Sequence, residues 1–302
     1  MNKFSLYTKT FQSNDWYEVF TYPAGEMQVR VTAPQLLNEP LNVRDTMPVT
    51  IVARLYNPAD LIELALLVNA LEGLGVVEIT LVIPYLPFSR ADRRFVRGDC
   101  KGVGFITNFL KPMGGVLTLD VHSNRAVNWA ITNVDPIIYI RAAIEHTSIR
   151  AECNAVSVLY PDKGAAERYV LPEHIGSNWS AVDVQCFYAT KQRDPVTGAL
   201  IGFSVPEMPK DLPVLIVDDI CDGGGTFIGI AKSLKEQGLD YSLYTTHSMY
   251  SKGTDVLYDA GFDYLYTTNS FYRDTADTPD KMVVYDCVGY LVNKAKQLNG
   301  EI

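Results

Sequence analysis

Acidic residues and glycines gather in one short stretch, Val214–Thr226, whose sequence is VLIVDDICDGGGT. The β-branched apolar run Val214–Val217 comes first and is typical of a strand buried on both faces. Apolar residues recur at helical spacing over 227–234, until Gly238 ends the pattern. The acids and glycines therefore lie where a parallel strand passes into a helix. In open α/β sheets, ligands bind at that end of the strands.

The residue types in this stretch suit a phosphate group that lies beside hydroxyl groups. Consecutive glycine amides before a helix N-terminus form a cradle for phosphate. Three carboxylates would repel a phosphate, so they suit ribose hydroxyls or a metal ion next to it. The stretch thus predicts a ribose-phosphate site, since ordinary acidic loops seldom carry three aspartates and three glycines together. The candidate residues are Asp218, Asp219, Asp222, Gly223, Gly224, Gly225 and Thr226.

A basic loop over 87–101 follows the apolar run Glu78–Tyr85 and contains four arginines and one lysine. Guanidinium groups pair bidentately with phosphate oxygens, so the loop could neutralise a polyphosphate. Its composition alone leaves a second interpretation open, namely an ordinary solvated basic loop.

Three further polar groups follow predicted strands. His122 comes two residues after Asp120 and is either a metal-binding or catalytic residue or a structural histidine. Asp162 ends a strand in the second half of the chain and is either a site residue or part of a turn. Lys191 and Arg193 lie in a polar loop that could close over a transferring phosphoryl group; taken alone, it is simply a loop.

The common nucleotide and hydrolase motifs are absent from the sequence. It contains no GxxxxGK[ST] loop, no GxGxxG after a strand and no GxSxG elbow. Nucleotide chemistry would therefore need another cradle, and Val214–Thr226 is the candidate.

Predicted strands alternate with helices throughout the chain, which indicates an α/β protein with two similar doubly wound, mostly parallel-sheet domains. We expect one domain over 1–148 and a second over 149–302, with the last helix free to pack back on the first domain. The predicted strands are Met27–Val31, Val49–Leu55, Glu78–Tyr85, Gly115–Val121, Ala155–Tyr160, Ala181–Tyr188, Val214–Val217, Ser242–Thr246 and Tyr264–Thr268. The predicted helices are Asp60–Glu72, Gly104–Leu110 and 227–234, and a last strand and helix are expected around Val283–Gln297.

Composition narrows the class of protein. The 302 residues are 47% hydrophobic and 20% charged, as in a soluble globular protein of about two domains. A net charge of −9 argues against a nucleic-acid surface. No apolar run reaches the roughly 18 residues of a membrane helix, and residues 1–20 lack the order of a signal peptide. The five scattered cysteines fit reduced cytoplasmic thiols.

Several segments resemble known families. Val214–Thr226 resembles the phosphoribosyl-diphosphate motif of type I phosphoribosyltransferases. Tyr85–Arg94 looks like the ATP-binding loop of the ribose-phosphate diphosphokinases, the enzymes that make phosphoribosyl diphosphate. Thr118–Ser123 resembles the metal-binding histidine segment of that family.

Three more segments carry the same resemblance. Tyr160–Arg168 is similar to the acidic ribose loop of the diphosphokinases. Lys191 and Arg193 have the spacing of their catalytic pair, and Tyr22–Glu26 resembles the segment that holds adenine. The matches run collinearly from about 20 to 270, so they cover most of the chain.

The resemblance implies transfer of a diphosphoryl group from ATP to the anomeric hydroxyl of a ribose 5-phosphate unit, with release of AMP. Lys191 and Arg193 would be catalytic, and Mg²⁺ would bind near His122 and Asp162. Asp162 and the residues of Val214–Thr226 would hold the acceptor. The chain would be a cytoplasmic homo-oligomer built from dimers, with hexamers as the larger assembly. The implied ATP-binding residues are Tyr22, Glu26, Arg90, Asp92 and Arg94.

The sequence departs from the family pattern after Asp222, where Gly223 and Gly224 replace a threonine and one further residue. A hydroxyl aimed at the 5-phosphate is lost, and we expect volume to open there. The default acceptor is ribose 5-phosphate, and the alternative is an esterified form such as ADP-ribose, for NAD salvage. Two other functions stay open, namely a phosphoribosyltransferase and a non-catalytic regulatory homologue.

Overall fold

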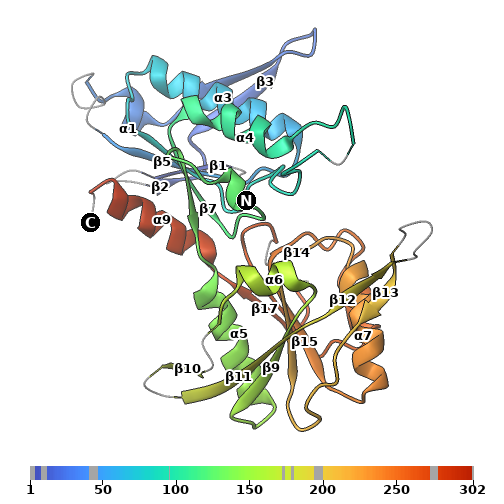
Figure 1. Cartoon of the computed structure of the whole chain (residues 1–302). Coiled ribbons are helices and arrows are strands. Elements are labelled where there is room, and N and C mark those ends of the chain that lie inside the picture. Colours follow the sequence, from blue (N-terminus) through green and yellow to red (C-terminus); the bar gives the residue numbers. More distant parts are fainter. Residues whose placement is uncertain are drawn as a thin grey trace. The chain divides into compact units, whose positions relative to one another are not determined.

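The structure is a computed structural model, and its residues form two units (Figure 1). Unit 1 comprises Met1–Asp135 and Asp286–Ile302, and unit 2 comprises Pro136–Tyr285. The division falls before helix α5 (Ile137–Arg150), whereas the expected boundary at 148 lies inside it. Helix α5 belongs to unit 2 because it packs on strands of that unit. The described residues are 4–7, 12–40, 47–94, 96–171, 174–177, 180–193, 200–272 and 278–300.

Unit 1 contains a six-stranded sheet in the order β2-β1-β5-β6-β7-β8 within the described residues. Strands β5 to β8 are parallel, and β1 pairs antiparallel with β5. A separate antiparallel hairpin is formed by β3 and β4. The strands are β1 (Phe4–Tyr7), β2 (Gln12–Ser13), β3 (Tyr17–Thr21), β4 (Met27–Val31), β5 (Val49–Ala53), β6 (Ile79–Val82), β7 (Gly115–Leu119) and β8 (Ile131–Val134).

Helices cover both faces of the unit 1 sheet (Figure 1). Helix α3 begins at Pro58, two residues before the predicted start at Asp60, and has a capping box: the side chain of Asn57 accepts from the amide of Asp60, and the side chain of Asp60 accepts from the amide of Asn57. Leu64 of α3 and Ile51 of β5 lie in one core cluster, whereas Thr50 points towards Asn299, beyond the end of α9. The helices are α1 (Pro34–Leu37), α3 (Pro58–Gly73), α4 (Gly102–Leu110), α9 (Cys287–Leu298) and the 3₁₀ turns η1 (Lys111–Met113) and η2 (Asn124–Ala126).

Unit 2 contains a seven-stranded sheet in the order β10-β11-β9-β14-β15-β16-β17, again counting described residues. All neighbours are parallel except β10, which pairs antiparallel with β11. A two-stranded antiparallel hairpin, β12–β13, stands apart from the sheet. The strands are β9 (Ala155–Tyr160), β10 (His174–Ser177), β11 (Ser180–Tyr188), β12 (Thr190–Arg193), β13 (Leu200–Ser204), β14 (Val214–Cys221), β15 (Tyr241–Ser248), β16 (Leu265–Thr268) and β17 (Met282–Tyr285).

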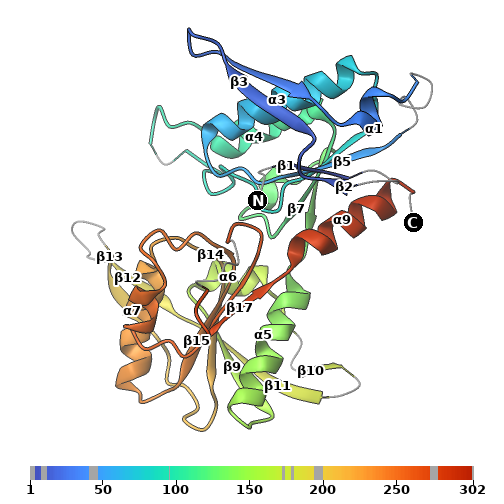
Figure 2. The same ribbon diagram turned by 180° about the vertical axis from the view of Figure 1, so that it is seen from behind.

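The central strand β14 is buried on both faces, as its apolar run predicted. Val214 and Ile216 pack in one cluster with residues of α7, while Leu215 is also fully buried and, by alternation, faces the opposite side. Figure 2 shows α5 and α7 on opposite sides of this sheet. Burying each such aliphatic side chain contributes about 1.5–3 kcal/mol. The helices of unit 2 are α5 (Ile137–Arg150), α6 (Lys163–Arg168), α7 (Gly225–Glu236) and α8 (Asp255–Tyr258).

The predicted alternation of strands and helices is confirmed, with two local corrections. The strand expected at Val214–Val217 continues to Cys221, because residues 218, 220 and 221 still pair with β15. The stretch expected as a polar loop from Thr190 begins as strand β12, which pairs with β13. None of the described helices has the length and apolar character needed to span a bilayer.

Candidate active site

The strand order of unit 2 reverses direction between β9 and β14. The chain continues from β9 to β11 on one side of the sheet and from β14 to β15 on the other. Pairing between β9 and β14 ends at Leu159 and Ile216. Such a switch point at the carboxyl ends of the strands is where open α/β sheets bind ligands. Asp162 follows β9, and Asp222–Thr226 follows β14, so both predicted segments lie at this point.

Asp162 connects helix α6 with strand β12. Its Oδ1 accepts a hydrogen bond from the amide of Ala165 at 3.0 Å and caps α6. Its Oδ2 accepts from Nζ of Lys191 at 2.7 Å. The structure therefore brings together two residues predicted separately. Arg193 is the last residue of β12, and its side chain lies outside the described part of the chain.

The Lys191 contact changes the acidity of Asp162. Partial burial acts to raise the pKa of the Asp162 carboxyl. The hydrogen bonds from Lys191 and the α6 backbone outweigh burial, so the net pKa lies below its ordinary value. The carboxylate form is therefore favoured in the folded protein.

Asp162→Asn is expected to lower the free energy of unfolding at pH 7 by less than about 1 kcal/mol, since the pair is more than a third exposed. Asparagine still caps a helix, so the loss reports the charge. A depressed folded pKa stabilises the protein above the unfolded pKa, and this gain disappears as pH falls through the folded value. Urea denaturation at pH 7 and in the acidic carboxyl range should show the deficit shrinking, and a constant deficit would contradict this assignment.

Asp218 and Asp219 form a compact acidic pair at the end of β14. The amide of Asp219 donates to Oδ1 of Asp218 at 2.9 Å. Burial, and then the neighbouring Asp219 charge, raise the pKa of Asp218 well above its ordinary value. Asp222 is exposed at the end of the same segment.

Arg168, the last residue of α6, supplies a cation to this pair. Its Nη1 lies 2.6 Å from Oδ2 of Asp219, so the two side chains form an ion pair. Arg168 was not predicted as a site residue and entered only as the last residue of the matched segment Tyr160–Arg168. The signal that could have indicated it is a basic residue six positions after Asp162, at the end of the predicted acidic loop.

The glycine segment leads directly into helix α7. Gly224 adopts a left-handed conformation with φ of 76° at the N-cap, where glycine carries no steric penalty. No described side chain caps α7, and its first turn contains no acidic residue. The first amides of the helix therefore remain available to an anion, as the predicted phosphate cradle requires.

The space beside the two replacing glycines is partly filled, which corrects the expectation of an open volume. A Cβ atom built on Gly223 would lie 3.4 Å from Cδ and Cε of Lys252. One built on Gly224 would lie 3.1 Å from Cδ2 of Leu257. Only Gly225, among these three, faces open space.

In unit 1, the arginine loop and the histidine segment follow the adjacent parallel strands β6 and β7. Asp92 joins them: Oγ of Ser123 donates to its Oδ2 at 3.1 Å, and Nη1 of Arg125 lies 3.5 Å from the same oxygen. Arg90 and Arg94 are exposed. Arg125 and Ser123 were not predicted, because only folding brings them to Asp92.

Two bulky or charged residues at these strand ends have left-handed backbones. Phe88 has φ of 62°, and Asp120, two residues before His122, has φ of 45°. Such conformations are costly for residues other than glycine and cluster at functional sites. His122 itself is half-buried.

The predicted adenine segment lies at the turn between β3 and β4. The amide of Tyr22 donates to the carbonyl of Glu26 at 2.8 Å, and both side chains are exposed. The Tyr22 ring meets Phe20 edge to face, with centroids 5.5 Å apart.

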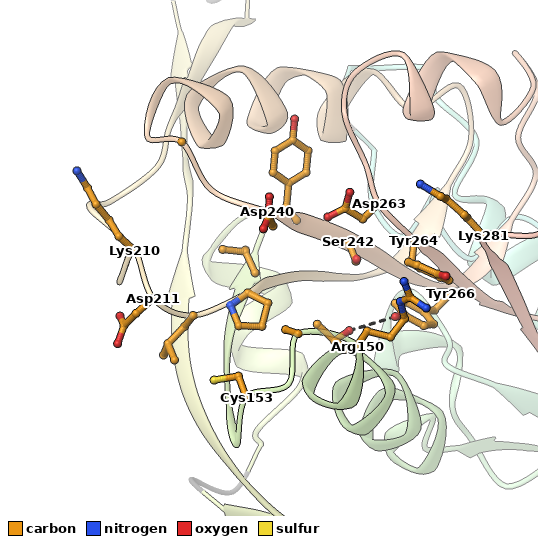
Figure 3. Close-up of a pocket in the computed structure, with 17 residues that line it drawn as sticks. Arg150, Cys153, Lys210, Asp211, Asp240, Ser242, Asp263, Tyr264, Tyr266 and Lys281 are labelled. Atoms are coloured by element: carbon orange, nitrogen blue, oxygen red, sulfur yellow. Dashed lines mark hydrogen bonds between the residues drawn. The ribbon is translucent and has the colours of Figure 1, made fainter.

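A pocket of about 430 Å³ lies elsewhere in unit 2, at the amino ends of β14, β15 and β16 (Figure 3). Arg150 lies over the ring of Tyr264 at 4.4 Å from its centroid, and Asp240, Asp263 and Lys281 also line the pocket. It contains none of the predicted site residues and lies at the opposite ends of the strands from Asp218 and Asp219.

Sequence comparisons agree with this geometry. Residues 13–114 match the N-terminal domain of ribose phosphate pyrophosphokinase. A ribose-phosphate pyrophosphokinase from Pyrococcus abyssi is 30% identical over 259 residues, covering 84% of this chain and 83% of the relative. The chain belongs to the ribose-phosphate pyrophosphokinase family.

Two further comparisons support the family and the fold. The ribose-phosphate pyrophosphokinase of Sulfolobus acidocaldarius is 29% identical over 266 residues, covering 84% of each chain. The crystal structure of phosphoribosylpyrophosphate synthetase from Mycobacterium smegmatis superposes with a TM-score of 0.71 at 17% identity, covering 95% of this chain and 91% of that one. The predicted α/β fold with parallel-sheet domains is thereby confirmed.

Proposed function

We propose that this protein is an ATP-dependent ribose-phosphate pyrophosphokinase. It would transfer the β,γ-diphosphoryl group of ATP to the anomeric hydroxyl of a ribose 5-phosphate unit and release AMP, with ribose 5-phosphate as the default acceptor. The observation that carries the proposal is the meeting of Asp162, Lys191 and the uncapped glycine cradle of α7 at one switch point, in a member of this family.

The proposed chemistry gives each group a separate task. The anomeric oxygen attacks the β-phosphorus of ATP. The bond between that phosphorus and the oxygen bridging it to the α-phosphate breaks, so AMP leaves with this oxygen, and the hydroxyl proton passes to solvent. Lys191 and Arg193 would stabilise the charge that develops on the transferred group. Asp218, Asp219 and Asp222 would hold ribose hydroxyls, while the amides of Gly223, Gly224 and Gly225 and the hydroxyl of Thr226 would take the 5-phosphate.

The nucleotide would be held by residues of unit 1. The exposed guanidinium groups of Arg90 and Arg94 suit phosphate oxygens. Tyr22 offers an exposed ring on which adenine can stack, with Glu26 beside it in the same turn. Asp92 would act by positioning the arginine loop through Ser123 and Arg125.

We also propose Mg²⁺ as the metal ion. Mg²⁺ is usually bound by one or two carboxylates together with substrate phosphates, and the candidate in unit 2 is the carboxylate of Asp162, whose Oδ2 accepts from Lys191 in this structure. The family resemblance also assigns His122, in unit 1, to a metal ion. Among the described residues, no group of three or more His, Cys, Asp or Glu side chains that could hold a metal ion occurs. When bound, the ion would neutralise phosphate charge.

Two versions of the proposed activity differ in the acceptor, which is either ribose 5-phosphate or an esterified form of it. The hydroxyl missing at Gly223 is the reason for keeping, as the second candidate, an esterified acceptor such as ADP-ribose, with a product for NAD salvage. We expect Mg-ATP with ribose 5-phosphate to release AMP and to give phosphoribosyl diphosphate, identified by phosphorus NMR. AMP release only with ADP-ribose would replace the default acceptor.

The same assay tests the other classes. Absence of AMP with both acceptors would leave a phosphoribosyltransferase or a regulatory homologue. The family further suggests a dimer-based homo-oligomer in the cytoplasm, with hexamers as the larger assembly, and sedimentation analysis measures that state.

A further inference from the structure

The segment that follows strand β15 is fixed against the end of β14. The amides of Met249 and Ser251 donate to the carbonyls of Cys221 and Asp222 at 2.8 and 3.2 Å. Tyr250, between them, is buried and has φ of 46°. These contacts hold the next residue, Lys252, at the glycine cradle.

The stem of Lys252 runs beside Gly223. Its Cδ and Cε atoms lie 3.4 Å, and Cγ 3.6 Å, from where a Cβ of residue 223 would be. The ammonium is one bond beyond Cε and therefore lies near Gly223, the first glycine of the cradle. A threonine at position 223 would place its branched side chain against this stem, so glycine and the lysine stem are complementary in shape.

The charge of Lys252 is exposed, and no ion pair to it occurs within the described residues. Three carboxylates lie in the same segment as the cradle, and Arg168 forms an ion pair with one of them, Asp219. An incoming phosphate therefore meets carboxylates that oppose it. A cation beside Gly223 offsets that repulsion and attracts the phosphate.

We propose that Lys252 is a specificity-determining residue of the acceptor site, where its ammonium binds the acceptor's phosphate in place of a hydroxyl from position 223. This inference rests on the proposed function. An ammonium is a compact point charge with three rotatable donors, so it does not require one fixed phosphate geometry. The site would thus accept a phosphate monoester and remain able to bind the phosphates of an esterified acceptor.

Lys252→Met tests the inference, because methionine keeps an apolar stem beside Gly223 and removes the charge. We expect the KM for the acceptor to rise by about 10-fold, the effect of losing one charge-assisted contact, while kcat and the KM for ATP stay within about twofold. Lys252→Arg should retain most of the affinity. Lys235→Met, an exposed lysine in the last turn of α7, is the matched control and should change nothing.

Ionic strength and the two acceptors complete the test. The acceptor KM of the wild type should rise more steeply with salt than that of Lys252→Met, since the variant lacks the screened charge. Ribose 5-phosphate and ADP-ribose are both assayed for AMP release. The KM values of wild type and variant are then compared for each acceptor that is active. If the wild type is active and the acceptor KM of Lys252→Met lies within twofold of the wild-type KM, the proposed role of Lys252 is overturned.

Calorimetric titration with ribose 5-phosphate and ADP-ribose, in the absence of ATP, separates the two proposals. An inactive wild type would overturn the proposed function. If that protein still bound an acceptor more tightly than Lys252→Met does, the phosphate contact would stand. Equal binding by both proteins would overturn it.

Discussion

Replacing Lys191 with alanine is expected to lower the turnover number for AMP release by about 100-fold, with little change in the KM for ATP. Loss of one donor aimed at developing charge typically costs a factor of 10²–10³ in turnover. Lys191 is well placed for this role, because it already lies 2.7 Å from a carboxylate at the switch point and projects from a hairpin outside the main sheet. Steady-state kinetics at saturating acceptor measures the effect.

The control for this variant is Lys163→Ala. Lys163 directly follows Asp162, is exposed, and pairs only loosely with Glu167, at 3.5 Å on the same short helix. Its loss should leave turnover within about twofold. If Lys191 served only to position Asp162, Lys191→Ala would raise the acceptor KM and spare turnover, and that outcome would contradict the proposed catalytic role of Lys191.

The sequence was sufficient to predict features that depend on local pattern. The apolar run before Asp218 and the helical spacing after Thr226 predicted a strand and a helix, and both are present. The helix predicted over Asp60–Glu72 is likewise present as α3, which begins two residues earlier. These features depend on residues close together in the chain, where periodicity and capping chemistry act directly.

Features that depend on contacts distant in sequence could not be predicted. Helix α5 has Arg141, Glu145 and His146 among its apolar residues, so its pattern was not recognised. Continuation of β14 beyond Val217 depends on pairing with β15. The approach of Lys252 to Gly223 requires the fold of the loop after β15, because nothing near Gly223 in the sequence indicates a lysine.

Arg168→Met is expected to lower the stability of unit 2 by about 3 kcal/mol, a large part of a typical domain stability of about 5–15 kcal/mol. The side chain of Asp219 is 5% exposed, and Asp218 beside it is also an acid. Removing one partner of a buried ion pair costs about 3–5 kcal/mol. We expect the low end, because the side chain of Arg168 is 24% exposed and solvent replaces part of the lost interaction. Urea denaturation followed by circular dichroism measures the loss.

Arg150→Met provides the control, since that exposed arginine lies over the Tyr264 ring in the same unit. An exposed cation–π contact is worth about 0.5–1 kcal/mol, so the control should lose no more than that.

The double variant Arg168→Met/Asp219→Asn identifies the cause of the loss. If Arg168 stabilises the fold by compensating the Asp219 charge, neutralising that carboxyl removes the need for it. The double variant should then recover at least half of the lost stability. If the stability loss of the double variant instead equals the sum of the losses of Arg168→Met and Asp219→Asn, the effect is due to packing of the arginine. Its guanidinium carbon lies 5.7 Å from the centroid of the Tyr169 ring. Recovery of stability without recovery of AMP release would show that the Asp219 carboxylate serves the acceptor site and that the role of Arg168 is to keep it charged there.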